Sequence, residues 1–279
     1  MRLGIITPAL TMLPTAHAGW EADATWDDIV SVVQAADRLG YDHITCSEHV
    51  AVPTSDAAVR GGRYWDPLST FGYLAAVTSS IRFATYVLVL GYHHPLEIVK
   101  RYGTLDHVAG GRLILGVGVG TLQPEFELLG APFEGRGSRA DDALRALRAA
   151  FGDTAPSYRG DYFTFDDVVV EPAGLPRDVP IWIGGQGARS LRRAVDLADG
   201  WAPFGIEPDR AQALLDEVGR PRDVVLQPPR PIDAVGDPDT ARVTLDALRV
   251  AGATHATLRF VHHSPAHYVE QLEAARDLV

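Results

Sequence analysis

The chain has 279 residues, of which 46 % are hydrophobic and 22 % are charged, so it can bury a sizeable core and is neither a disordered tail nor a disulfide miniprotein. The formal net charge of −11 argues against nucleic-acid binding, because a site for a phosphate backbone needs an excess of lysine and arginine. A single cysteine, Cys46, excludes an intramolecular disulfide and cysteine-rich zinc or iron–sulfur sites.

The chain begins with a short apolar run that is typical of a strand. The run LGIIT at 3–7 stops at Pro8 and is too short for the apolar core of a signal peptide. No window approaches the roughly 18 apolar residues that a membrane-spanning helix needs. We therefore expect a cytoplasmic protein with no membrane partner.

Strand-like and helix-like segments then alternate to the end of the chain. Apolar runs predict eight strands, at 3–7, 43–46, 83–90, 112–118, 180–185, 200–204, 223–228 and 255–260. The segments between them have helical periodicity, and several end in a glycine directly before the next strand, as in ADRLGYDHI and LRVAGATHATL. This alternation with continuously apolar strands indicates a parallel α/β sheet. Eight units in roughly 250 residues favour a (β/α)8 TIM barrel over a doubly wound open sheet.

The length beyond a minimal barrel lies in two segments. One is the long loop 50–66 after the second strand. The other is 153–179, which reads as a hairpin turned at Arg159-Gly160-Asp161 and inserted before the fifth strand. No linker divides the chain, so we expect one domain, 1–279.

Barrel enzymes carry their reacting groups on the loops after the strands, so the residues behind each predicted strand are the candidates for a site. Glu48 and His49 follow the second strand. A histidine beside a carboxylate can accept or donate a proton near neutral pH. The alternative is a helix cap or a buried polar pair.

Glycines follow the fourth and fifth predicted strands. Gly116 and Gly118 lie in GVGVG, where missing side chains let a flat ring or a backbone approach closely, although a tight turn explains them as well. Gly184, Gly185, Gln186 and Gly187 precede a helix whose free backbone N–H groups would attract an anion such as a phosphate. An ordinary glycine-rich connection is the alternative.

Aromatic and histidine side chains also fall near the predicted strand ends. Trp65, Tyr92 and Phe204 favour an apolar mouth that accepts a ring, or else they anchor loops. The pairs His93-His94 and His262-His263 lack the i,i+4 spacing of metal ligands, and adjacent residues of a strand face opposite ways. We therefore expect no metal site.

Four stretches together resemble a known family. They are AADRLGYDHITCSEHV, IRFATYVLVLGYHHPLEIVKRYGTLDHVAGGRLILGVGVG, GRGSRADDALRALR and VPIWIGGQGARSLRRAVDLADGW. In this order they resemble the luciferase-like monooxygenase superfamily of flavin and deazaflavin oxidoreductases, in particular the subgroup dependent on the deazaflavin coenzyme F-420. The resemblance spans roughly positions 3–204.

The resemblance implies roles for the candidate residues. His49 matches the histidine proposed to transfer a proton or orient the substrate beside the coenzyme ring, and Glu48 matches its acidic neighbour. A non-prolyl cis peptide behind the ring would fall at about Tyr86-Val87. The remaining matches are Gly116 and Gly118 under the ring, and Gly184, Gly185, Gln186 and Gly187 at the coenzyme's phosphate or ribityl tail.

Two departures from the family pattern bear on the substrate. The sugar-phosphate dehydrogenases of the subgroup have a glutamate after the strand-four glycines, where this chain has Thr121. Lysines that hold a sugar phosphate have no counterpart, since Lys100 lies in the helix after the third strand. We therefore do not expect a glucose-phosphate-like substrate.

The resulting hypothesis is an oxidoreductase that transfers a hydride between coenzyme F-420 and a small organic, apolar or aromatic substrate, with His49 as the proton partner. One alternative is an FMN-dependent luciferase-like monooxygenase, and another is a flavin- or deazaflavin-binding protein without catalytic activity. The resemblance also implies a homodimer, for which the apolar helix 67–80 is a reasonable surface, although core packing explains that helix as well.

Overall fold

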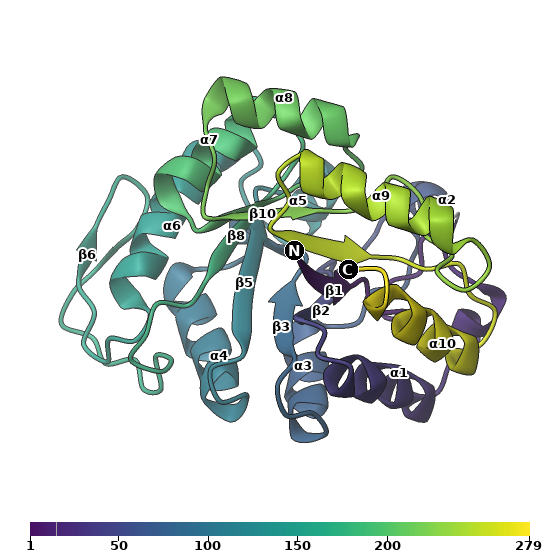
Figure 1. The fold of residues 1–279 in the computed structure, drawn as a ribbon. Helices are drawn as coiled ribbons and strands as arrows, with labels where there is room; N and C mark the ends of the chain where they lie inside the picture. The colour runs from purple at the N-terminus through teal and green to yellow at the C-terminus, as the bar shows by residue number, and fades with distance from the viewer. Residues whose placement is uncertain (15) are drawn as a thin grey trace.

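Eight parallel strands close into a ring in the computed structural model, which describes residues 1–14 and 16–279 (Figure 1). In ring order they are β3 (Arg82–Thr85), β2 (His43–Cys46), β1 (Arg2–Ile5), β11 (His255–Leu258), β10 (Asp223–Leu226), β9 (Gly200–Ala202), β8 (Ile181–Gly184) and β5 (Leu113–Gly118). Pairing between β3 and β5 closes the ring. The predicted TIM barrel is confirmed, and each of the eight predicted strands contains part of one barrel strand.

The third predicted strand, 83–90, is interrupted in the structure. The short strand β4 (Leu88–Val89) continues beyond β3 and pairs with the end of β5. Between β3 and β4 the Tyr86–Val87 peptide bond is cis, at the position that the family resemblance implied. The continuous apolar run in the sequence hides this break, because both halves are buried.

Helices surround the ring, with their apolar sides against the strands (Figure 1). The longer ones are α1 (Trp26–Arg38), α3 (Pro67–Ala76), α4 (Pro95–Val108), α6 (Arg136–Ala150), α7 (Ala188–Leu197), α8 (Pro208–Val218), α9 (Pro238–Val250) and α10 (Pro265–Arg276). Several begin with proline at the first helical position, and the side chains of Thr25, Asp66, Asp237 and Ser264 cap α1, α3, α9 and α10. None of the helices in the described ranges is long and apolar enough to cross a membrane.

The segments of extra length are both structured. The loop 50–66, expected without regular structure, contains the short helix α2 (Thr54–Arg60). The predicted hairpin is confirmed as β6 (Tyr158–Arg159) and β7 (Thr164–Phe165), which lie beside α6 and outside the ring (Figure 1). Asp142 of α6 holds it in place by accepting hydrogen bonds from the Tyr158 hydroxyl at 2.6 Å and the Phe163 N–H at 2.9 Å.

The two ends of the barrel interior differ in polarity. At the amino ends of the strands lies a buried group that we call the polar plug: Asp42, His43, Arg82, His255 and Thr257. His43 links Asp42 to Thr257, because its Nδ1 atom lies 2.9 Å from the Asp42 carboxylate and its Nε2 atom lies 2.9 Å from the Thr257 hydroxyl. An apolar layer around Trp182 lies above the plug and separates it from the carboxyl ends of the strands.

Candidate active site

A cavity of about 420 Å³ opens at the carboxyl ends of the strands, where sequence reasoning placed the site. All eight barrel strands, or the residues directly after them, contribute to its lining. The lining residues used below are Ile6, Glu48, His49, Tyr86, Val87, Tyr92, Gly118, Gly184, Gly185, Phe204, Gln227 and Arg259. Its walls are mostly apolar, which suits a ligand with a ring or a hydrocarbon body.

His49 contacts a carboxylate from a distant part of the chain. Its Nδ1 atom lies 2.6 Å from Glu125, which is on the short helix α5 (Gln123–Leu128) that follows β5. Glu125 is fully buried and also accepts hydrogen bonds from the N–H groups of Val50 and Ala51 and from the Tyr92 hydroxyl, at 2.7, 3.0 and 2.8 Å. Four donors therefore converge on one carboxylate.

The environment of Glu125 keeps this carboxylate ionised. Burial raises its pKa, but the hydrogen bonds from Ala51, His49 and Tyr92 outweigh burial, so the pKa of Glu125 is lowered. Burial, the hydrogen bond to Glu125 and its charge raise the pKa of the Tyr92 phenol, which stays neutral as a donor. An ionised carboxylate can only accept, so Nδ1 of His49 is a donor, and in the neutral ring Nε2 is the nitrogen that can accept a proton.

Glu48 has a different set of partners from His49. Its carboxylate accepts the Val89 N–H at 2.7 Å and lies 2.7 Å from Nε2 of His93. Burial lowers the pKa of His93, but the Glu48 hydrogen bond and charge prevail and raise it. Glu48 thus holds the segment after the cis peptide in place, while Glu125 is the carboxylate that orients His49.

Glycines on two neighbouring strands make room for Val87 at the cis peptide. A Cβ at Gly118 would lie 2.8 Å from one Val87 methyl group, and a Cβ at Gly184 would lie 2.9 Å from the other. Gly116 has a different neighbour, because a Cβ there would lie 1.9 Å from the Thr85 carbonyl oxygen. Gly116 does not line the cavity. Its missing side chain lets β5 lie close to Thr85 of β3, the strand that leads into the lining residues Tyr86 and Val87.

The loop after β8 leads directly into α7. Gly185 lines the cavity, whereas the Gln186 amide turns away to donate to the Phe204 and Gly205 carbonyl oxygens. Gly187 is the N-cap of α7, and a Cβ there would meet open space. Among residues 1–14 and 16–279, nothing accepts the N–H groups of Ala188 and Arg189 in the first turn. They remain available to an anion.

The predicted aromatic residues separate into two groups. Tyr92 and Phe204 line the cavity, and Phe204 lies with its ring centroid 6.4 Å from that of Tyr86. Trp65 lies outside the lining, because its ring packs edge-on against Trp26, 4.7 Å away between centroids. Trp65 therefore takes the anchoring role that was the alternative for these residues.

Sequence reasoning missed several polar residues of the site, among them Glu125, Gln227 and Arg259. Glu125 carried one signal: the sugar-phosphate dehydrogenases that the sequence resembles have a glutamate after the glycines that match Gly116 and Gly118, and Glu125 lies four positions beyond Thr121, which takes that place here. Gln227 and Arg259 lie inside the predicted strands 223–228 and 255–260, whereas in the structure β10 ends at Leu226 and β11 at Leu258. The rule that pointed to His49 was therefore applied beyond these two residues.

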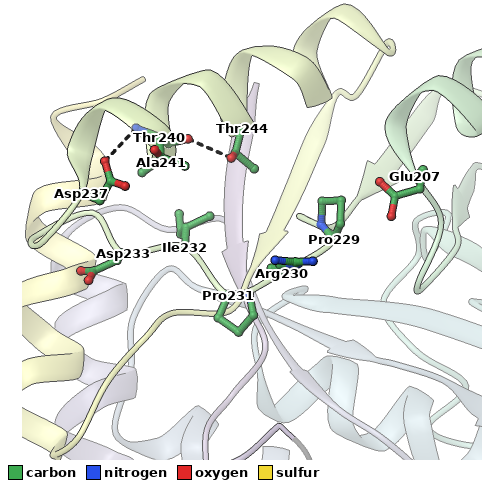
Figure 2. Close-up of a pocket in the computed structure, with 10 residues that line it drawn as sticks. All are labelled: Glu207, Pro229, Arg230, Pro231, Ile232, Asp233, Asp237, Thr240, Ala241 and Thr244. Atoms are coloured by element: carbon green, nitrogen blue, oxygen red, sulfur yellow. Dashed lines mark hydrogen bonds between the residues drawn. The ribbon is translucent and has the colours of Figure 1, made fainter.

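A second cavity, of about 460 Å³, lies on the outer side of the barrel mouth. Figure 2 shows that its lining comes from the start of α8, the loop after β10 and the first turns of α9. Two of its acidic residues serve the local fold: Asp237 caps α9 through the Thr240 N–H, and Asp233 accepts from Gly236 and Gln271. None of the predicted site residues is in this cavity.

The closed parallel barrel with a cavity at the carboxyl ends of its strands defines the class of the protein, the (β/α)8 TIM barrels. Residues 1–227 match the family described as luciferase-like monooxygenase. The chain belongs to this family, whose members are oxidoreductases or monooxygenases.

Curated relatives match over most of the chain. An uncharacterized protein of Mycobacterium tuberculosis (strain ATCC 25618 / H37Rv) is 29 % identical over 215 residues, covering 73 % of this chain and 74 % of that protein. The 5,10-methylenetetrahydromethanopterin reductase of Archaeoglobus fulgidus is 25 % identical over 208 residues, covering 72 % of this chain and 58 % of the reductase.

Solved structures share the fold at low identity. The monooxygenase RslO1 from Streptomyces bottropensis superposes with a TM-score of 0.80 at 18 % identity, covering 100 % of this chain and 98 % of that one. A type II Baeyer-Villiger monooxygenase of Pseudomonas putida in complex with FMN gives 0.74 at 17 %, covering 100 % and 97 %. An F-420-dependent secondary alcohol dehydrogenase gives 0.71 at 14 %, covering 100 % and 98 %.

Proposed function

We propose that the protein is a coenzyme F-420-dependent oxidoreductase that transfers a hydride between the coenzyme and a small organic substrate with an apolar or aromatic body, with His49 as the proton partner. The observation that carries the proposal is the contact between the buried Glu125 and His49, which lines a largely apolar cavity to which every barrel strand contributes. The F-420-dependent alcohol dehydrogenase with the same fold supports the choice of coenzyme.

The residues present fit a flavin-type coenzyme in two respects. The glycines at 118 and 184 leave the cavity floor around Val87 free of further side chains, which suits a flat ring. The free N–H groups at the start of α7 suit a phosphate in the coenzyme's tail. A bound deazaflavin would supply the hydride chemistry, since it has carbon where a flavin has N5.

The chain's own groups would handle the proton. Glu125 holds the His49 ring through Nδ1, which leaves Nε2 as the nitrogen of His49 that can accept a proton. His49 is one of the residues that line the cavity. For an alcohol substrate, Nε2 takes the hydroxyl proton while the carbon loses its hydride, and in the reverse direction His49 returns that proton. The apolar walls exclude water from the reacting atoms.

Parallel titrations with oxidised F-420 and FMN test the coenzyme. We expect F-420 to bind at least about tenfold more tightly than FMN, followed by turnover of simple alcohols or ketones with F-420. Purification of the protein with bound FMN, or tighter binding of FMN, would contradict the proposal. Tight binding of F-420 with no turnover, unchanged by His49→Ala, would indicate the binding protein without catalytic activity.

An FMN-dependent monooxygenase is the second candidate. It is favoured by the two monooxygenase structures, whose TM-scores of 0.80 and 0.74 exceed that of the F-420-dependent dehydrogenase. FMN and F-420 both offer a flat ring and a phosphate, so the features that fit one fit the other. Oxygen consumption with reduced FMN and a substrate would favour this candidate.

A homodimer and a cytoplasmic location stay predictions. The apolar residues Phe71 and Leu74 of α3 are fully buried within the chain itself, whereas Tyr73 on the same helix is about half exposed, at 48 %. Light scattering on the purified protein would measure the oligomeric state.

A further inference from the structure

Arg259 brings a positive charge into the cavity from the barrel itself. It follows β11 directly, and alternation along the strand puts it on the same side as His255 and Thr257, which face the barrel interior. Its backbone is fixed, because its carbonyl oxygen accepts the Ile232 N–H at 2.9 Å. The guanidinium therefore enters the cavity from a rigid strand end, where Arg259 is among the lining residues.

The guanidinium has no protein partner in the described part of the chain. Within residues 1–14 and 16–279, no carboxylate, carbonyl or hydroxyl oxygen forms a hydrogen bond or ion pair with the Arg259 side chain. Glu21 is close enough for its charge to act on Arg259, but its oxygens already accept the N–H groups of Ala9 and Ala18 at 2.7 Å. Arg82 in the polar plug, by contrast, is paired with Asp42.

This arrangement is unfavourable without a ligand. Burial lowers the pKa of Arg259, while the negative charge of Glu21 acts in the opposite direction. A half-buried guanidinium that lacks an anion bears a desolvation cost, and a planar oxyanion would offset that cost through two parallel N–H···O bonds. Arginine suits such pairing better than lysine, because its donors form a fixed fork.

The surroundings of Arg259 indicate what else the ligand carries. Ile6 is the corresponding lining residue of the adjacent strand β1, and Gln227 follows β10 on the other side. Ile6 offers apolar surface and Gln227 an amide. A compact apolar or aromatic body with one carboxylate therefore matches this side of the cavity.

The coenzyme's anionic tail has a different place. The free N–H groups of α7 follow β8, and β9 and β10 lie between β8 and β11 in the ring. A phosphate at the start of α7 would thus lie across the mouth from Arg259. His49 follows β2, on the other side of β1 from Arg259, so a ligand that reaches both residues spans the mouth above β1.

We propose that Arg259 binds a carboxylate group of the substrate, so that the substrate is a small apolar or aromatic carboxylate. The inference rests on the proposed function, because it places the substrate in the same cavity as the coenzyme and His49. Arg259 is then a specificity-determining residue: it selects anionic over neutral substrates of the same shape and leaves the proton chemistry to His49.

Calorimetric titration with benzoate and with its neutral isostere benzamide tests this inference. For the unmodified protein, with and without coenzyme, we expect benzoate to bind more tightly than benzamide. Arg259→Gln should weaken benzoate binding by about tenfold or more and change benzamide binding by less than about twofold. Arg259→Lys should retain part of the preference, since it keeps the charge but not the fork.

Two comparisons make the test specific. Arg230→Gln removes an arginine outside this cavity and should leave benzoate binding unchanged. Arg60→Gln removes the other arginine of the lining, on α2, and should affect benzoate less than Arg259→Gln does. If Arg60→Gln abolishes the preference and Arg259→Gln does not, Arg60 holds the anion and the proposal is wrong.

The coenzyme titration separates this proposal from the proposed function. Arg259→Gln should change the affinity for F-420 or FMN by less than about twofold. A tenfold loss of coenzyme affinity with unchanged benzoate binding would assign Arg259 to the coenzyme and overturn the inference. If the unmodified protein binds neither coenzyme, the proposed function fails, while benzoate binding to the coenzyme-free protein still decides the role of Arg259.

Discussion

The Nδ1 atom of His49 lies 2.6 Å from the carboxylate of Glu125, although the two residues are 76 positions apart in the chain. The contact joins the loop after β2 to the helix after β5 and fixes which ring nitrogen carries the proton. Because Glu125 is buried and accepts three further hydrogen bonds, it cannot turn away to another partner. The reactive face of His49 is therefore set by a residue that need not touch the substrate.

Glu125→Gln tests this positioning role. The amide keeps the shape of the side chain but gives His49 a weaker, uncharged acceptor, so we expect turnover to fall by roughly tenfold to a hundredfold. Coenzyme affinity should stay within about twofold. The ¹⁵N shifts of the His49 ring should move toward a mixture of tautomers, which a merely structural effect would not produce.

The control for this variant is Glu127→Gln on the same helix, where the side chain is exposed. It should leave both turnover and the His49 spectrum unchanged. Glu125→Gln also places an amide group among N–H donors, so its unfolding free energy should be measured alongside. Unchanged turnover and an unchanged His49 tautomer in Glu125→Gln would show that Glu125 does not position His49.

The sequence predicted one half of this pair and missed the other, and the reason is physical. His49 follows a strand directly, so the barrel rule locates it without knowledge of any contact. Glu125 reaches the site only because the loop after β5 folds back over the mouth, and no local periodicity records that. The same holds for Glu48, whose position was predicted but whose partners, Val89 and His93, lie on a segment that becomes adjacent only when the barrel closes.

The fold was easier to predict than the site because its sequence signals are local. Apolar runs, helix-ending glycines and the turn at Gly160 each act over a few residues, and eight repeats of one unit leave few topologies. Prediction failed where a long-range contact decides the conformation. The anchoring of Trp65 on Trp26 is an example.

Charge at the first turn of α7 should control coenzyme affinity. Gly187 is the N-cap, and a side chain there would meet open space, so Gly187→Asp and Gly187→Asn should both fold and both cap the helix. The aspartate would compete with a coenzyme phosphate for the free N–H groups and repel it, whereas asparagine is neutral. We expect the aspartate variant to bind F-420 or FMN about tenfold or more weakly than the asparagine variant, by fluorescence titration. Equal affinities would mean that the phosphate lies elsewhere.

The polar plug leaves no space at Gly4 of β1. A Cβ there would lie 2.2 Å from the imidazole of His43, a rigid ring held by Asp42 and Thr257. We expect Gly4→Ala to lower the free energy of unfolding by roughly 1–3 kcal/mol, the usual cost of overpacking, in chemical denaturation. Gly62→Ala is the matched control, since a Cβ at Gly62 meets nothing within 4 Å, and it should be neutral or slightly stabilising. A neutral Gly4→Ala would show that His43 can move, contrary to its hydrogen bonds.

The polar plug should also make stability depend on pH. Burial lowers the pKa of His255 to about 4, with the positive charge of Arg82 acting in the same direction and Asp42 and Asp223 opposing it. Arg82 lies 3.4 Å from Nε2 of His255 and Asp42 lies 3.8 Å away, so protonation would place a cation beside a guanidinium.

The sign of the effect follows from which state takes up the proton first. As the pH falls through the ordinary histidine range near 6.5, the unfolded chain binds a proton at His255 while the folded chain does not, until the pH approaches 4. The contribution of neutral His255 is therefore complete above about pH 6.5 and is lost progressively between 6.5 and 4. For one such group the loss is about 3 kcal/mol. Denaturation at a series of pH values should show a smaller dependence of the unfolding free energy on pH for His255→Gln than for the unmodified protein. His43 and His262, whose pKa values are also lowered, should account for the pH dependence that remains.

The control is His107→Gln, at an exposed position in the last turn of α4, which should keep the full pH dependence. An identical slope for His255→Gln would mean that the folded protein admits a proton at the plug as readily as the unfolded chain does.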